Sequence, residues 1–176
     1  DEYLLWFSEL VEGLGLDRMS LVGNSMGGFG AAYCAMHLPG RVHRLVLVAP
    51  DGFASPGFEY GKAPDVGVTV RMMQYVLPRS VLTMSLKPAY ADPATMTDEL
   101  ATRYHDMMLA PGVRGAMIRR MEQMALTDPV PMLRTISAPT LLVWGGKDAM
   151  IPIAHADDYL KALPHARLVT LPGVSE

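Results

Sequence analysis

A serine between two glycines is the feature of this sequence best suited to chemistry. Residues 23–27 read Gly-Asn-Ser-Met-Gly, after an apolar run and before a helix-compatible stretch at residues 26–38. On a sharp turn from a strand into a helix, a serine holds its hydroxyl above the sheet, where it can attack a carbonyl carbon. The first N–H groups of that helix would face the oxyanion that forms. The pattern predicts Ser25 as a nucleophile and the Met26 amide as an oxyanion donor.

The same turn explains the flanking glycines. So tight a turn brings backbone against backbone, and we expect a Cβ at Gly23 or at Gly27 to collide with the neighbouring chain.

Helices and apolar strands alternate around this motif. We expect helices at residues 2–13, 26–38 and 153–163, and strands at residues 19–24, 45–49, 140–144 and 167–171. The strands are nearly continuous apolar runs, which is typical of a parallel sheet covered by helices on both faces. The sequence therefore predicts an α/β fold with a mostly parallel sheet. Without a strand before it, the run at residues 19–24 is expected to be an exposed sheet edge.

A long insertion interrupts this alternation. It contains expected helices at residues 68–77, 79–86, 97–109 and 113–126, separated by prolines and glycines. Ten of the 14 methionines lie between residues 51 and 139, and methionine side chains adapt well to varied apolar ligands. We expect residues 51–135 to form a helical cap over an apolar pocket, with residues 1–50 and 136–176 forming the α/β core.

Composition argues against several classes of function. The net charge is −3 and the basic residues are scattered, which argues against nucleic acid as a partner. No apolar run approaches the roughly 20 residues that cross a bilayer. No Cys/His cluster or G-x-G-x-x-G loop indicates a metal or an organic cofactor. The single cysteine, Cys34, is expected to be a buried thiol in a cytoplasmic protein. A small-molecule substrate is therefore expected, and the oligomeric state stays open.

Two motifs resemble those of the α/β-hydrolase family. Residues 23–28 are similar to the nucleophile turn of its capped members, including hydrolases that cleave carbon–carbon bonds in aromatic degradation. Residues 144–148, Trp-Gly-Gly-Lys-Asp, are similar to the loop that carries the acid of the family's serine, acid and histidine triad. The resemblance covers essentially the whole chain. It implies a partial α/β-hydrolase fold with the cap inserted after Pro50. Ser25 itself excludes the aspartate nucleophile of related dehalogenases and epoxide hydrolases.

The resemblance implies Asp148 as the triad acid. Asp51 is the alternative, because it ends the preceding strand at a position that some relatives use for the acid. A carboxylate in this role holds the histidine in the correct tautomer. Replacing each aspartate by asparagine would distinguish them.

The triad histidine is missing from its expected place. Relatives usually continue after the last strand with Gly-His, whereas this sequence has Ser175 and Glu176 there. His165 precedes that strand at the edge opposite Ser25, His155 is expected to face solvent, and His105 of the cap is an alternative base. The family also places several strands ahead of the first helix. We therefore expect a partial chain that is nearly inactive alone, with the catalytic histidine outside it. The alternatives are a second chain that supplies the missing parts and a naturally shortened, non-catalytic protein.

Three functions remain open. The first is hydrolysis of carboxylic esters with an apolar moiety, through an acyl-enzyme at Ser25. The second is hydrolysis of a carbon–carbon bond in a dienoate ring-cleavage product, whose carboxylate could pair with Arg103 of the cap. The third is a non-catalytic scaffold or binding piece.

Overall fold

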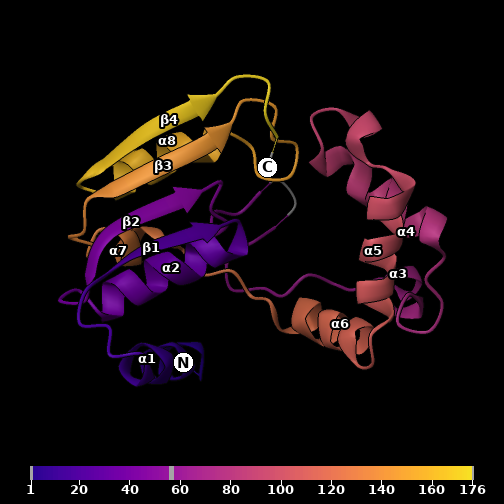
Figure 1. The fold of residues 1–176 in the computed structure, drawn as a ribbon, viewed down its shortest axis with the longest axis horizontal. Helices are drawn as coiled ribbons and strands as arrows, with labels where there is room; N and C mark the ends of the chain where they lie inside the picture. Colours follow the sequence, from indigo (N-terminus) through magenta and orange to yellow (C-terminus); the bar gives the residue numbers. More distant parts are fainter. Residues whose placement is uncertain (1, 56–57, 176) are drawn as a thin grey trace. The chain divides into compact units, whose positions relative to one another are not determined.

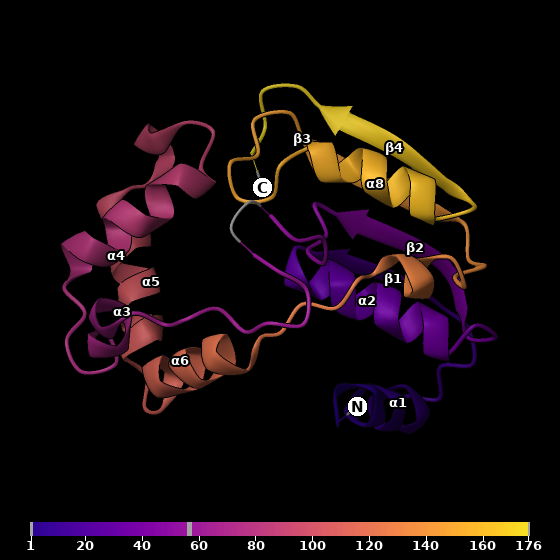
Figure 2. The ribbon, with the colours of Figure 1, turned by 180° about the vertical axis from the view of Figure 1, so that it is seen from behind.

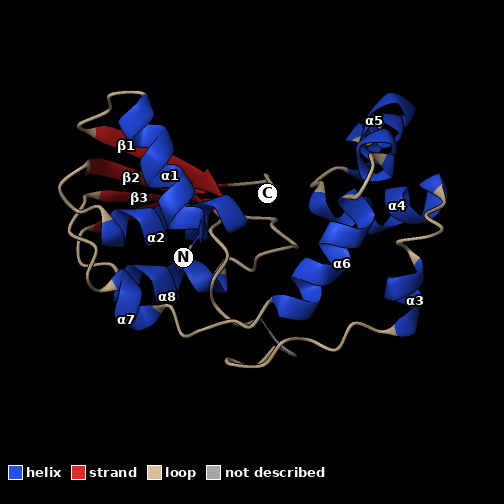
Figure 3. Cartoon of the chain, turned by 90° about the horizontal axis from the view of Figure 1, so that it is seen from below, coloured by secondary structure: helices blue, strands red, loops and turns tan. Residues whose placement is uncertain are grey.

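A computed structural model describes residues 2–55 and 58–175. The chain divides into two compact units. The sheet unit comprises the residues up to 53 and from 128 onward, and the helical unit comprises residues 54–127. All four strands belong to the sheet unit (Figures 1 and 3).

All pairings between the described strands are parallel, which agrees with the prediction of a mostly parallel sheet. Its strands are β1 (Met19–Asn24), β2 (Val42–Val48), β3 (Thr140–Gly145) and β4 (Ala166–Leu171), and they lie in the order β1-β2-β3-β4. The register pairs Asn24 with Val48, and Val48 with Val143. Because the strands run in the same direction, the loops after β1, β2 and β3 all leave from one edge of the sheet. The edge position of β1 was also predicted.

Three helices cover one face of this sheet. They are α2 (Met26–His37), α7 (Val130–Leu133) and α8 (Ala154–Ala162), which contact one another in that order (Figure 2). A fourth helix, α1 (Glu2–Gly13), packs against α2. Among the described residues, the opposite face is more exposed; Val22 on it is 70% accessible. This differs from the expected cover on both faces, because an apolar strand indicates burial but does not say which residues provide it.

The core lies between the sheet and its helices. Its largest wholly buried side chains come from the strands, the helices and the segment before β3, namely Trp144, Tyr159, Leu45, Leu47, Leu133, Ile136 and Leu142. Cys34 on α2 is 1% exposed, as predicted. Burial raises the pKa of its thiol to about 11, so it stays protonated at neutral pH.

The helical unit contains the short helices expected from the insertion. They are α3 (Val68–Met72), α4 (Arg79–Leu86), η1 (Lys87–Ala89), η2 (Pro93–Thr95), α5 (Asp98–Leu109) and α6 (Val113–Gln123). Thr97 caps α5 by accepting a hydrogen bond from the Leu100 amide at 3.2 Å. The helix expected at residues 68–77 ends early, and Pro78 disfavours helical geometry just before it.

The boundaries of the units differ from those expected for the cap. The expected insertion, residues 51–135, included the helix that the structure shows as α7. This helix contacts α2 and α8, so it belongs to the sheet unit. Among the described residues, no helix is both long and apolar enough to cross a bilayer.

Leu142→Ala tests the core. Leu142 is 0% exposed in the central strand β3, so its truncation should lower the free energy of unfolding by about 2–5 kcal/mol. Leu5→Ala is the control, because Leu5 is 66% exposed on α1 and its loss should cost within about 0.5 kcal/mol. Guanidinium unfolding followed by circular dichroism measures both. Equal losses would contradict the assignment of the core.

Candidate active site

Ser25 occupies a strained turn between β1 and α2. Its φ of 53° and ψ of −123° lie where a residue with a Cβ is disfavoured. Such a conformation costs about 1–3 kcal/mol and persists only where the surroundings impose it. The side chain is half-buried. Ser25 is thus one of two non-glycine residues with a positive φ in the described part of the chain, and the other is Ala49.

Backbone hydrogen bonds hold this turn. The Ser25 amide donates to the Val48 carbonyl at 2.9 Å and so extends the pairing of β1 with β2. The Ser25 carbonyl accepts from the amides of Gly28 at 2.9 Å, Phe29 at 3.3 Å and Asp51 at 2.9 Å. The turn is therefore fixed from its own helix and from the loop after β2.

The glycines of the turn have unequal roles. A Cβ at Gly23 would overlap the Gly27 carbonyl and lie 2.7 Å from the Gly28 Cα. A Cβ at Gly28 would lie 2.8 Å from the Pro50 Cβ. A Cβ at Gly27 would meet nothing within 4 Å, so the expected collision there is wrong. Gly27 therefore matters because its backbone lies against Gly23, whereas a side chain at position 27 would have room.

Asp148 lies in the loop after β3, and its two carboxylate oxygens differ in their hydrogen bonds. Its Oδ1 accepts from the amides of Met150 at 2.9 Å and Ile151 at 2.8 Å, which orients the carboxylate. Its Oδ2 is buried and has no hydrogen-bond partner among the described residues. A buried oxygen without a partner costs free energy, so its presence in a fold calls for an explanation.

The sheet brings Ser25 and Asp148 to the same edge. They follow β1 and β3, which are separated by β2 alone. Two steps between neighbouring strands amount to about 10 Å. A similar distance separates the two partner atoms of an imidazole that makes a hydrogen bond at each of its nitrogens. The geometry suits a serine and a carboxylate that share a histidine between them.

Asp51 lies between these two positions, but its contacts are mainly structural. Its Oδ1 accepts from the Gly52 amide at 2.8 Å. Its amide donates to Ser25, and its carbonyl accepts from the Tyr159 hydroxyl at 2.6 Å. Asp148 differs from Asp51 in having a buried carboxylate oxygen without a hydrogen-bond partner among the described residues. Nothing in the sequence signals the Tyr159 contact, because the two residues are 108 positions apart.

The histidines of the sheet unit lie in varied surroundings. The His165 carbonyl accepts from the amide of Thr140, the first residue of β3, which places it at the edge opposite Ser25, as predicted. His155 is 8% exposed and packs 6.0 Å from the Phe53 ring, measured between centroids. The expectation that it faces solvent is wrong, because α8 turns that side toward the core.

The two cap residues nominated from the sequence lie on α5. Arg103 is exposed. His105 is half-buried, and its Nε2 lies 2.8 Å from the Leu77 carbonyl of the same unit. This contact ties the imidazole to the backbone of the helical unit.

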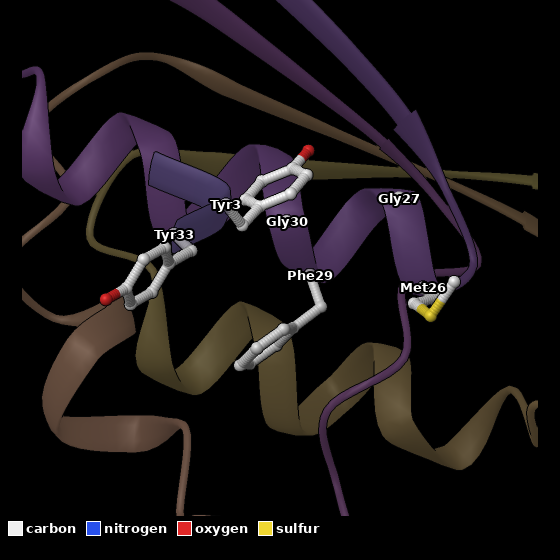
Figure 4. A pocket seen from close by; sticks show the side chains of 6 residues that line it. All are labelled: Tyr3, Met26, Gly27, Phe29, Gly30 and Tyr33. Atoms are coloured by element: carbon white, nitrogen blue, oxygen red, sulfur yellow. The ribbon is translucent and has the colours of Figure 1, made fainter. Parts of the chain in front are cut away.

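Each unit contains an apolar hollow. In the sheet unit, a cavity of about 350 Å³ lies along α1 and α2 and is lined by Tyr3, Met26, Gly27, Phe29, Gly30 and Tyr33 (Figure 4). It includes the residue after Ser25, and sequence reasoning missed it. In the helical unit, a cavity of about 160 Å³ is lined by twelve residues, four of them methionines. No cluster of three or more His, Cys, Asp or Glu side chains suited to a metal occurs in the described part of the chain.

A comparison with known families agrees with this geometry. The family model described as alpha/beta hydrolase fold matches residues 1–175. The chain belongs to this family. The strained serine after β1 and the aspartate after β3 thus lie in a chain of the α/β-hydrolase family.

Similar proteins include enzymes named as hydrolases of 2-hydroxy-6-oxo compounds. The chain is 30% identical over 167 residues to a 2-hydroxy-6-oxo-6-phenylhexa-2,4-dienoate hydrolase of Burkholderia cepacia, covering 93% of this chain and 58% of that protein. It is 29% identical to a 2-hydroxy-6-oxononadienedioate/2-hydroxy-6-oxononatrienedioate hydrolase of Comamonas testosteroni, with the same coverage. The chain thus spans less than two thirds of the length of these relatives.

A solved structure shows the same fold. The 2-hydroxy-6-oxo-6-phenylhexa-2,4-dienoate hydrolase of Rhodococcus sp. strain RHA1 superposes with a TM-score of 0.77 at 20% identity. The match covers 98% of this chain and 62% of that one.

Gly23→Ala tests the crowding at the turn. The added Cβ meets backbone that cannot rotate away, so the free energy of unfolding should fall by about 1–3 kcal/mol. Gly27→Ala is the matched control on open space, and it should be neutral or stabilise the helix by up to about 1 kcal/mol. Thermal unfolding measures both. The account of the turn would be wrong if Gly27→Ala were the more damaging change.

Proposed function

We propose that the whole protein is a serine-dependent hydrolase that cleaves a carbon–carbon bond in 2-hydroxy-6-oxo-dienoates. The observation that carries the reaction type is the strained Ser25 at the same sheet edge as the buried, unoccupied Oδ2 of Asp148. The substrate class is suggested by the names of the relatives, which act on such dienoates.

In this proposal Ser25 attacks the ketone carbon of the substrate. An imidazole takes the proton from Oγ, because an unassisted serine hydroxyl is a poor nucleophile. Asp148 Oδ2 accepts the N–H on the other side of that ring, which fixes the tautomer and stabilises the imidazolium. The fixed Oδ1 ensures that the free oxygen keeps its direction.

The oxyanion would be stabilised at the start of α2. The carbonyl of Ser25 already occupies the amides of Gly28 and Phe29. Among the described residues, none accepts a hydrogen bond from the Met26 amide. This first-turn N–H lies at the positive end of the helix, where a negative oxygen is favoured. We assign it as one oxyanion donor.

The bond that breaks joins the ketone carbon to the neighbouring carbon of the chain. Before this bond breaks, the proton of the 2-hydroxyl group moves to that neighbouring carbon, which becomes tetrahedral while carbon 2 becomes a carbonyl. The electron pair of the broken bond then passes through the remaining double bond to the oxygen on carbon 2, which takes up a proton. The ketone carbon remains bonded to Ser25 as an acyl-enzyme. Water, activated by the same imidazole, then releases a carboxylic acid, so substrate and one water yield a hydroxydienoate and an acid.

In this proposal, the histidine that supplies the imidazole belongs to the whole protein and lies near the segment after β4. That segment already returns to the acid loop, because the Lys147 amide donates to the Val174 carbonyl at 2.9 Å. A Cβ at Gly145 would also lie 2.6 Å from the Ser175 carbonyl. His105 is a poorer base, because its Nε2 is engaged with Leu77 in the helical unit.

The helical unit is proposed as the cap that selects the substrate. Its methionine-lined cavity shows that its short helices leave adaptable apolar surface. Arg103 is the proposed partner of a substrate carboxylate, since its guanidinium is exposed and can bind such a group in a bidentate way.

Ester hydrolysis is the second candidate. The same serine, acid and oxyanion donor could form an acyl-enzyme from an ester. The apolar cavity beside Met26 would favour an apolar acyl or alcohol group. The sequence alone placed esters first, whereas the names of the relatives now favour the carbon–carbon bond.

The first test compares two substrates on the whole protein. A 2-hydroxy-6-oxo-dienoate should be consumed with a higher kcat/KM than a short nitrophenyl ester, followed by the loss of dienoate absorbance and by nitrophenol release. Ser25→Ala should lower kcat by about 10⁶ on both. A faster ester reaction would favour the second candidate, and full activity of Ser25→Ala would refute both.

Asp148→Asn against Asp51→Asn identifies the acid. Asparagine at position 148 cannot hold the imidazole in the required tautomer, so kcat should fall by about 10⁴. Asparagine at position 51 can still accept from the Gly52 amide, so kcat should fall by less than about tenfold. Steady-state kinetics at neutral pH gives both values. A reversed order would transfer the role of acid to Asp51.

A further inference from the structure

Tyr159 is a wholly buried tyrosine on α8 with its hydroxyl directed at the loop after β2. Its ring packs edge-on against Phe53 at a centroid distance of 5.0 Å and lies 6.1 Å from Trp144. These contacts leave the ring little freedom to move. The Tyr159 hydroxyl is therefore held in a fixed position and can hold its hydrogen-bond acceptor in place.

The hydroxyl connects to the Ser25 turn in two steps. It donates to the Asp51 carbonyl at 2.6 Å, and the Asp51 amide donates to the Ser25 carbonyl at 2.9 Å. Of the three amides that bind the Ser25 carbonyl, the one from Asp51 is the only donor outside α2 among the described residues. The position of Asp51 thus decides whether the turn is held from both sides.

The loop after β2 is packed so closely that no other group can take the place of the Tyr159 hydroxyl. Gly52, with a φ of 136°, has its Cβ position 3.0 Å from the Tyr159 hydroxyl oxygen and 2.9 Å from the Phe29 Cδ2. Phe29 lies in the first turn of α2, one turn beyond Ser25. Tyr159, the loop and the start of α2 therefore form one close-packed layer.

The same aromatic contacts lead to the acid. Trp144, the penultimate residue of β3, lies beside Tyr159, and its Nε1 donates to the Ile151 carbonyl at 3.0 Å. The Ile151 amide donates in turn to Asp148 Oδ1 at 2.8 Å. The Tyr159 and Trp144 pair thus supports the loops of both proposed catalytic residues.

We propose that Tyr159 is a positioning residue that holds the strained backbone of Ser25 through the Asp51 peptide. This inference rests on the proposed role of Ser25 as nucleophile. Without the hydroxyl, the Asp51 loop loses its anchor and the Ser25 turn samples relaxed conformations in which Oγ and the Met26 amide are misaligned.

Tyr159→Phe removes the hydroxyl and keeps the ring. A fluorophosphonate, which bonds covalently to an activated serine hydroxyl with release of fluoride, is reacted with the whole protein. The second-order rate constant at Ser25 should fall five- to twentyfold while every site still reacts in the end. With substrate, kcat should fall by a similar factor and KM should change less than twofold.

Two control variants separate positioning from general destabilisation. Tyr90→Phe removes a hydroxyl that donates to Tyr104 at 3.3 Å in the helical unit. Ile136→Val removes one methyl group from the core before β3. Both should lower the Tm slightly and leave the rate constant at Ser25 unchanged.

Hydrogen exchange gives a readout that does not depend on catalysis. The amides of Gly28, Phe29 and Asp51 should exchange at least fivefold faster in Tyr159→Phe and stay unchanged in both controls. Unchanged exchange at these amides, or fewer reactive sites that each react at the parent rate, overturns the role of Tyr159. Failure of the parent protein to react at Ser25 overturns the proposed function instead, and the exchange rates still decide whether Tyr159 holds the turn.

Discussion

The carbonyl oxygen of Ser25 is the atom on which the arrangement of the site depends. It receives hydrogen bonds from two amides of α2 and from the amide of Asp51, while the Ser25 amide is bound to β2. These contacts together impose a φ of 53° on a residue that has a Cβ. Unfavourable backbone geometry of this kind survives only where several contacts determine it at once. The serine is therefore held in position before any substrate arrives.

The parallel sheet supplies the remaining geometry. Because β1, β2 and β3 run the same way, the Ser25 turn, the Asp51 loop and the Asp148 loop leave from one edge of the sheet. Ligands of open α/β sheets bind at such edges, beyond the carboxyl ends of the strands. In the proposed function, the buried Oδ2 of Asp148 accepts a hydrogen bond from an imidazole N–H, and this bond offsets the free-energy cost of its burial.

Much of this could be predicted from local patterns. The apolar runs and the glycines located β1, β3 and the turn at Ser25, because strand burial and tight turns leave direct marks on composition. The proposed acid, Asp148, was nominated from a family motif. That its Oδ2 is buried without a hydrogen-bond partner could not be predicted from the sequence. Contacts between segments that are distant in the sequence could not be predicted from local patterns. The Tyr159 bond to Asp51, the crowding of Gly28 against Pro50 and the burial of His155 all depend on how elements meet in space.

The central claim is that Ser25 was shaped to form a covalent bond with a carbonyl carbon, and a trapped adduct tests it most directly. A crystal structure of the whole protein soaked with a phosphonate ester should show density continuous from Ser25 Oγ. The charged oxygen of the adduct should lie about 2.7–3.1 Å from the Met26 amide nitrogen, with the positive φ retained. Phosphorus bound to another residue, or an unmodified Ser25 in a relaxed turn, would contradict the account.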